Sequence, residues 1–131
     1  MNKANVCEFI VSVMCGLIGW LYAPFDAIFY ALIAFVIFDY ITGVVKAIKQ
    51  KNLSGEIGFW GITKKIIIFM VVAIGNILDK YVIGSGSAIR SMLIFFYLSN
   101  EGISIIDNLK QIGVPLPDKL QEIISNLKNK N

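Results

Sequence analysis

Four long apolar stretches fill most of this 131-residue chain, and each is close to the length that a helix needs to cross a bilayer. They cover residues 6–22, 27–45, 61–83 and 88–106. About 20 apolar residues in an α-helix span a hydrocarbon core of roughly 30 Å. Little chain is left for a domain in water, so the pattern predicts an all-α integral membrane helical bundle. We expect about four transmembrane helices, forming one domain over residues 1–131.

The composition argues against a soluble enzyme. Charged residues make up only 16% of the chain, against about a quarter in soluble domains, and the mean hydropathy is +0.71. The chain has no histidine, which removes the commonest general base and metal ligand. No nucleophile with its base, no phosphate-binding loop and no metal-ligand spacing is found. We therefore expect no catalytic residue, no metal and no cofactor.

The last part of the chain has a different pattern. Gly113, Pro115 and Pro117 break the fourth apolar stretch, because proline cannot continue a helix. Residues 116–128 then alternate with helical spacing, which predicts an amphipathic tail helix. Its apolar face carries Leu116, Leu120, Ile123, Ile124 and Leu127, and its polar face carries Lys119, Glu122, Asn126 and Lys128.

Positive charge is distributed unevenly among the connecting segments. One Lys or Arg stands at the N-terminus, five lie between residues 46 and 65, and four follow residue 106, whereas only Lys80 and Arg90 flank the link 84–87. Cytoplasmic loops concentrate positive charge, so four spans place both termini and the central loop in the cytoplasm. In the main alternative the chain has three spans, and residues 6–22 lie in the interface or against neighbours. A lysine cluster beside a span sets orientation and meets anionic headgroups, so we expect no nucleic acid partner.

Polar residues recur at helical spacing inside the apolar stretches. In lipid such a stripe must face another helix or water. The stripes therefore either join helices within one subunit or line an aqueous path between assembled copies. A bundle this small has little interior of its own, which favours self-association. The candidates are Asp39 and Thr42 in the second stretch, Lys65, Asn76 and Asp79 in the third, and Arg90, Asn100, Glu101, Ser104 and Asn108 in the fourth.

Small residues mark candidate helix-packing positions. Ser12, Gly16 and Gly19 lie on one side of the first stretch, and Gly43 lies in the second. Small residues three or four positions apart let helix backbones approach closely in membranes. We expect these four positions to pack against other helices.

Several sequence blocks together point to a family. The chain reads Asp-Tyr-Ile-Thr-Gly at 39–43, Lys-Ala-Ile-Lys at 46–49, Leu-Ser at 53–54 and Gly-Phe-Trp-Gly-Ile-Thr-Lys-Lys at 58–65. It continues with Asn-Ile-Leu-Asp at 76–79, Tyr-Leu-Ser-Asn-Glu-Gly-Ile-Ser-Ile-Ile-Asp-Asn at 97–108 and Gly-Val-Pro-Leu-Pro at 113–117. From residue 27 to residue 127 the chain resembles the phage-lysis and toxin-secretion (TcdE-like) holins of clostridia and bacilli. Gly55, where a serine is expected, and Asp107, where glutamate is usual, are mild departures.

The resemblance implies a holin, a small multi-pass protein of the bacterial cytoplasmic membrane that accumulates, forms homo-oligomers and opens a pore or lesion. Such a lesion releases endolysin for host cell lysis, or lets large toxins without signal peptides leave the cell, with no stable binding of either cargo. An antiholin that regulates a partner holin, and a small membrane channel or transporter, are the alternatives. The timing and the cargo come from the resemblance alone.

Overall fold

The structure, a computed structural model, describes residues 2–130, and it describes their side chains except at position 124 and at positions 127–130. Within that range the chain is helical and contains no strand, which confirms the predicted all-α fold. The elements are α1 (Lys3–Tyr22), α2 (Ala27–Lys49), α3 (Gly55–Ile77), the π-helical segment η1 (Leu78–Ile83), α4 (Ala88–Ile112) and α5 (Asp118–Lys130).

Short polar side chains fix where three of the helices begin. Asn2 accepts the backbone N–H of Asn5 at the start of α1, and Asp26 accepts that of Phe29 at the start of α2. Ser54 does the same for α3 by accepting the N–H of Ile57 at 3.1 Å. These are N-caps, which satisfy donors that have no partner inside the helix.

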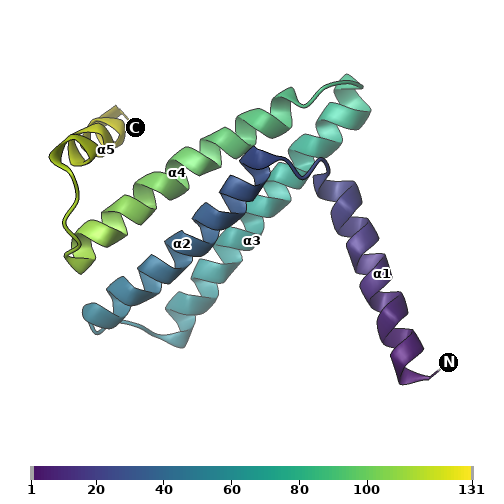
Figure 1. The fold of residues 1–131 in the computed structure, drawn as a ribbon, viewed down its shortest axis with the longest axis horizontal. Helices are drawn as coiled ribbons and strands as arrows, with labels where there is room; N and C mark the ends of the chain where they lie inside the picture. Colours follow the sequence, from purple (N-terminus) through teal and green to yellow (C-terminus); the bar gives the residue numbers. More distant parts are fainter. Residues whose placement is uncertain (1, 131) are drawn as a thin grey trace.

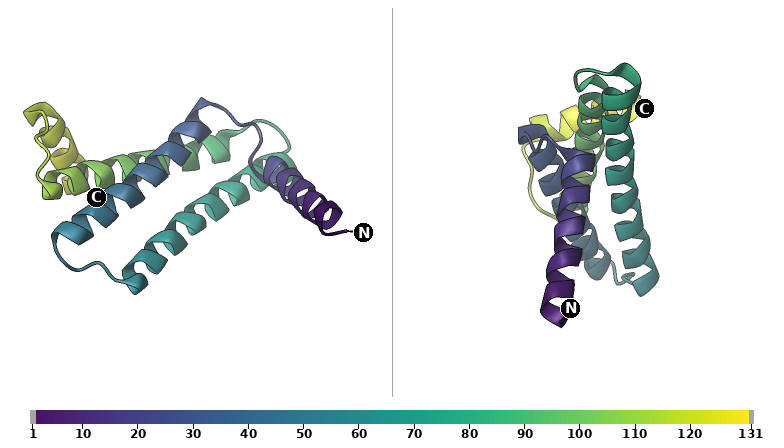
Figure 2. Two further views of the ribbon diagram at one scale, coloured as in Figure 1. Left: turned by 60° about the horizontal axis from the view of Figure 1, so that its bottom comes forward. Right: turned by 90° about the vertical axis from the view of Figure 1, so that its right-hand side faces the viewer.

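Three helices form the body of the molecule, and the first helix leaves it. Figure 1 shows α2, α3 and α4 side by side, with η1 extending α3 up to the turn into α4. Figure 1 and the left view of Figure 2 show α1 projecting away from this bundle, which it meets near the turn into α2. Every residue from Lys3 to Ile18 is exposed. Helix α1 is therefore held by one end only.

The apolar core of the bundle lies toward the end where α1 joins it. Phe29, Leu32 and Val36 of α2 meet Ile68 and Val72 of α3 and Ile94 of α4. Glycines permit the close helix contacts around this core. A Cβ on Gly75 would lie 2.6 Å from Cδ1 of Leu93, and a Cβ on Gly102 would lie 3.4 Å from the Phe35 ring.

The outer faces of the helices are apolar. Large side chains such as Phe38 in α2, Met70 in α3 and Phe95 in α4 are more than half exposed, far more apolar surface than a protein in water shows. Four helices are long and apolar enough to cross a membrane: α1, α2, α3 with η1, and α4. Exposed Trp60 and Tyr81 stand about 30 Å apart along α3 and η1 at 1.5 Å per residue. This separation matches the two interfaces where such aromatics gather.

The helices extend beyond the apolar stretches from which they were predicted. Helix α3 begins at Gly55 rather than at residue 61 because Ser54 caps it there, and α2 and α4 continue as polar helix to Lys49 and Ile112. Helix α4 then stops at Gly113, whose φ of 102° suits glycine.

The tail helix α5 starts at Asp118, two residues later than predicted, directly after Pro117. Its Leu120 and Ile123 line an apolar groove with α2 and α4. The side chains of Ile124, Leu127 and Lys128, which complete the predicted amphipathic pattern, lie outside the described residues.

Candidate functional site

Three charged side chains, one from each helix of the bundle, meet in its interior. The ammonium of Lys65 in α3 donates to a carboxylate oxygen of Asp39 in α2 and, at 2.7 Å, to one of Glu101 in α4. The two carboxylate side chains are 7% and 6% exposed and that of Lys65 is 19% exposed. We call these residues, together with Thr42, Ser104 and Asn108, the inner polar cluster.

Asn108 adds a second set of contacts between α4 and α2. Its side-chain nitrogen donates to Oδ1 of Asp39 at 3.1 Å, to the Asp39 carbonyl at 3.3 Å and to Oγ1 of Thr42 at 3.0 Å. Gly43 lies beside this amide, and a Cβ there would be in ordinary van der Waals contact with it at 3.7 Å. Asp39 is thus held by both neighbouring helices.

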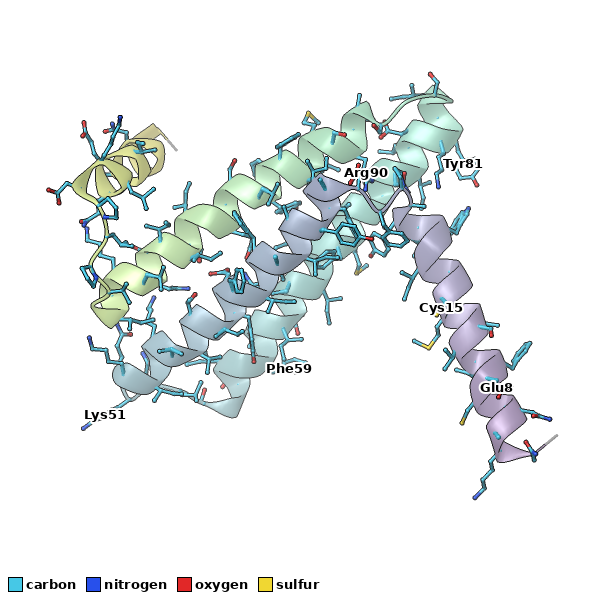
Figure 3. All side chains as sticks on the ribbon, viewed as in Figure 1. Glu8, Cys15, Lys51, Phe59, Tyr81 and Arg90 are labelled. Atoms are coloured by element: carbon cyan, nitrogen blue, oxygen red, sulfur yellow. The ribbon has the colours of Figure 1, made fainter. Side chains whose placement is uncertain are left out.

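A cavity of about 210 Å³ adjoins the inner polar cluster. Polar groups of Asp39, Lys65 and Asn108 line it at one end, and its lining continues to Leu53 in the α2–α3 loop. Lys65 lies little more than one helical turn from Trp60. The cavity therefore joins the cluster to the end of the bundle where the lysine-rich loop lies, marked by Lys51 in Figure 3.

A second group of polar side chains lies at the opposite end of the bundle, where the α1–α2 turn meets α3, η1 and α4. Figure 3 shows Arg90 at this junction. Its guanidinium bonds the Asp26 carboxylate at 3.0 and 3.2 Å and the Pro24 carbonyl at 2.6 Å, and it lies 5.6 Å from the centre of the Phe29 ring. The Arg90 side chain is fully buried. We call Asp26, Asn76, Asp79, Lys80 and Arg90 the turn cluster.

Asp79 of η1 caps helix α4. Its two carboxylate oxygens accept the backbone N–H groups of Ile89 and Arg90 at 3.0 and 2.9 Å. Ser87, the residue directly before α4, makes no side-chain cap. Asp79 is fully buried, so its charge is satisfied by the first turn of α4.

Asn76 and Lys80 hold the end of α1. The Asn76 side-chain amide donates to the carbonyls of Leu21 and Ala23 at 2.6 and 3.2 Å, and the Lys80 ammonium donates to that of Trp20 at 3.0 Å. The last carbonyls of a helix have no partner within it. The turn cluster provides these partners and so fixes the point from which α1 leaves the bundle.

Asp26 lies in the turn between α1 and α2 and pairs with Arg90 of α4. The hydrogen bond from Arg90 lowers the pKa of this carboxyl below its ordinary value, partial burial opposes the shift, and the N–H of Phe29 adds to it. Asp26 therefore stays ionised and paired at neutral pH.

Most of the sequence-predicted residues lie in the inner polar cluster, in the turn cluster or on exposed helix surfaces. Asn100 is exposed on α4 and belongs to neither cluster. Gly16 and Gly19 have no atom within 4 Å of where a Cβ would stand, and Ser12 is exposed. Among the described residues, Gly43 is the one of these three glycines with an atom of another helix within 4 Å of where a Cβ would stand. The inner polar cluster contains Asp39, Thr42, Lys65, Glu101, Ser104 and Asn108, and the turn cluster contains Asn76, Asp79 and Arg90.

Two residues of the turn cluster, Asp26 and Lys80, were not among the sequence candidates. Asp26 directly precedes an apolar run, which is a recognisable N-cap signal. Its role as the partner of Arg90, 64 positions away, has no local signal. Lys80 was counted only as a loop charge, but its ammonium binds the Trp20 carbonyl at the end of α1.

The chemistry available to these clusters is that of charge pairing and hydrogen bonding. Within residues 2–130 no three His, Cys, Asp or Glu side chains come together as a metal site. Both clusters hold helices together through groups that would be costly to leave unpaired in lipid.

Comparison with known proteins places these features in a family context. The sequence model of the bacteriophage holin family matches residues 16–129. This range includes every residue of both clusters and the end of α1 from Gly16 onward.

Relatives extend over the whole chain. It is 39% identical over 129 residues to a Clostridium perfringens protein described as an uncharacterized 14.9 kDa protein in the nagH 3′ region, covering 98% of each chain. The uncharacterized protein Lmo0128 of Listeria monocytogenes is 37% identical, over 83% of this chain and 77% of its own. A probable holin of Bacillus phage phi105 is 40% identical over 81 residues, covering 62% of this chain and 59% of its own. No solved structure matches the chain.

Proposed function

Because the chain belongs to the bacteriophage holin family, we propose that it forms homo-oligomers in the cytoplasmic membrane and opens a lesion there. The observation that supports this most directly is the combination of buried charge and exposed apolar surface in one small bundle. Six polar or charged side chains are buried within it, whereas many large apolar side chains on its outer faces are exposed. Every residue of α1 up to Ile18 is exposed as well.

Helix α1 is the first candidate for contacts between copies. Its small residues Ser12, Gly16 and Gly19 have no packing partner within the described part of the chain. In a membrane, small residues at this spacing stabilise helix pairs through close backbone contact. A second copy of the chain has the same small residues on its α1, so symmetric pairing of the two α1 helices gives each of them a packing partner.

Assembly would change the surroundings of the inner polar cluster. In the single chain Lys65 bonds both Asp39 and Glu101 inside the bundle. When copies gather, these groups exchange their internal partners for water and for neighbouring subunits, and the faces that carry them line an aqueous opening. Self-association depends on concentration by mass action, so accumulation of the protein sets the time of opening.

The cargo passes through the lesion without binding the protein stably. Host lysis requires release of an endolysin, and toxin export requires release of large proteins that lack signal peptides. An antiholin that inhibits a partner holin is the second candidate, and a small selective channel is the third. A transporter normally has a preformed midplane site, often with broken helices and internal repeats. This sequence has no convincing internal repeat, and this favours a lesion over a selective channel.

Inducible expression with and without a co-expressed endolysin separates these candidates. A holin stops growth abruptly and releases the endolysin activity into the medium. An antiholin is harmless alone and delays lysis by a second holin, and a selective channel lets ions pass while the endolysin stays inside. Continued growth with the full-length protein present in the membrane would refute the lesion.

A further inference from the structure

The inner polar cluster contains more negative than positive charge. Asp39 projects from α2 and Glu101 from α4, and both bond the same ammonium, that of Lys65 in α3. The other polar side chains around the cluster and its cavity are hydroxyls and an amide, and none of them is a cation: Tyr40, Thr42, Ser104 and Asn108. Lys65 is the only cation among the described residues that line the adjoining cavity. One negative charge therefore remains without a cation.

Burial makes this imbalance significant. Asp39 and Glu101 are 6% and 5% exposed as whole residues, and both accept hydrogen bonds from the same Lys65 ammonium. Hydrogen bonds from Asn108 stabilise Asp39 but carry no charge that could cancel the excess. Two carboxylates that share a poorly solvated site do not both stay ionised without a counterion.

The cavity gives small ions a route to the cluster. Its volume of about 210 Å³ is several times the roughly 30 Å³ that one water takes up in the liquid. Its lining runs from Asp39 and Lys65 to Leu53 in the loop between α2 and α3. Water and hydrated cations on that side of the membrane can therefore reach the carboxylates.

We propose that the inner polar cluster is a binding site for one small monovalent cation, a proton or a sodium ion, taken up through this cavity. A proton arrives from a hydronium ion in the cavity, forms an O–H bond with a carboxylate oxygen and leaves a water molecule behind. A sodium ion is held by the oxygens of the two carboxylates and of the nearby hydroxyl groups. Either ligand makes the cluster neutral.

This inference concerns the same cluster that opens in the proposed function, but its test does not depend on lysis. The full-length protein is purified in detergent and studied by infrared spectroscopy and thermal unfolding. The infrared spectrum at neutral pH shows whether a protonated carboxylic acid is present. Thermal unfolding is compared in sodium, potassium and choline chloride at equal ionic strength.

The decisive variant is Glu101→Gln, which leaves one carboxylate with one ammonium and so removes the need for a cation. The matched control is Glu56→Gln, which makes the same change at an exposed position in the first turn of α3. A protonated carboxyl band that is present in the wild type and in E56Q but lost in E101Q identifies the proton. A higher unfolding temperature in sodium than in potassium or choline, lost in E101Q alone, identifies sodium.

The wild type alone can overturn the proposal. Absence of a protonated carboxyl band at neutral pH, combined with identical unfolding in the three salts, excludes both ligands. Should E101Q fail to fold, Asp39→Asn removes the same charge and is read in the same way. A cation-binding protein that causes no lysis would leave this inference standing and refute the proposed function, and the reverse result would separate them equally clearly.

Discussion

The carboxylate of Asp79 accepts the backbone N–H of Arg90 at 2.9 Å across the turn formed by residues 84–87, and both residues are fully buried. Because Asp79 caps α4, the Arg90 side chain is positioned by the helix start and reaches back to Asp26 and the Pro24 carbonyl. One pair of residues thus connects the end of η1, the start of α4 and the α1–α2 turn.

Replacing Asp79 with alanine should destabilise the bundle by about 1–3 kcal/mol, because two buried N–H groups at the start of α4 lose their acceptor. Unfolding in mixed detergent and denaturant measures the change. Ser87→Ala is the control, since the Ser87 side chain makes no cap, and it should change stability by less than about 0.5 kcal/mol. Equal effects of the two variants would show that Asp79 does not cap α4.

The Asp26–Arg90 pair should make stability depend on pH in the acid range. The pKa of Asp26 is lowered in the folded protein, so its stabilising contribution is complete above the unfolded-state pKa near 4. That contribution is lost as the pH falls through the lower folded value. Unfolding curves between neutral pH and about pH 3 should show this loss in the wild type and not in Asp26→Asn.

Asp118→Asn serves as the control for the acid titration, because Asp118 is exposed at the start of α5. Other carboxyl groups also titrate in this range, so the measured quantity is the difference between each variant and the wild type. A pH profile of D26N that runs parallel to that of the wild type would contradict the role of the pair.

Replacing Lys65 with methionine should destabilise the protein by roughly 3–5 kcal/mol, because two buried carboxyl groups lose their shared cation. Lys64→Met removes the same charge from the neighbouring exposed position and should have an effect within about 0.5 kcal/mol. Under the proposed function K65M also shifts the onset of lysis at equal membrane level, while K64M does not. Equal stability of K65M and K64M would rule out the inner polar cluster as a stabilising element.

Substituting leucine at Gly16 and Gly19 should leave the subunit folded, because open space surrounds both positions. If α1 pairs with α1 of a neighbouring copy, the added side chains separate the helices, weaken chemical cross-linking into oligomers and delay lysis. Leu17→Phe adds volume at an exposed position elsewhere on α1 and is the control. Normal oligomers in the double variant would exclude the small-residue stripe as the contact.

The positive-charge asymmetry predicts which loops face the cytoplasm. In a variant with Cys7 and Cys15 replaced by alanine, a single cysteine at Ser85 should react with a membrane-impermeant maleimide in intact spheroplasts. Cysteine at Asn52 should react only after the membrane is disrupted. Both positions are exposed in the structure. The opposite labelling pattern would reverse the proposed orientation.

The same assay tests whether α1 crosses the membrane. Cysteine at Asn2 should be protected in intact spheroplasts if α1 is a fourth span and the N-terminus is cytoplasmic. Labelling of Asn2→Cys from outside, together with the expected pattern at Ser85 and Asn52, would support the three-span alternative.

Much of the site could be predicted because helical periodicity is a local property. The spacing of Asp39 and Thr42, or of Glu101, Ser104 and Asn108, places each set on one helix face from sequence alone. Apolar length and composition likewise predicted the four helices that are long and apolar enough to cross a membrane. The bulk of the fold follows from these two regularities, since a polar group in lipid must turn toward another helix.

Which polar groups pair across helices was decided by the tertiary structure. From spacing alone Arg90 could have bonded Asp39 or Glu101, yet it bonds Asp26, and Lys65 takes both of those carboxylates instead. The close contact of α3 and α4 at Gly75 belongs to the same packing, which brings Asp79 to the start of α4.

The sequence by itself determined that this protein is a bundle of lipid-embedded helices with polar inner faces, because each helix contains that information in its own periodicity. The tertiary structure alone decided the partners of each charge and the separation of α1 from the bundle. Those outcomes depend on the relative height and rotation of neighbouring helices, which packing sets and no local pattern records.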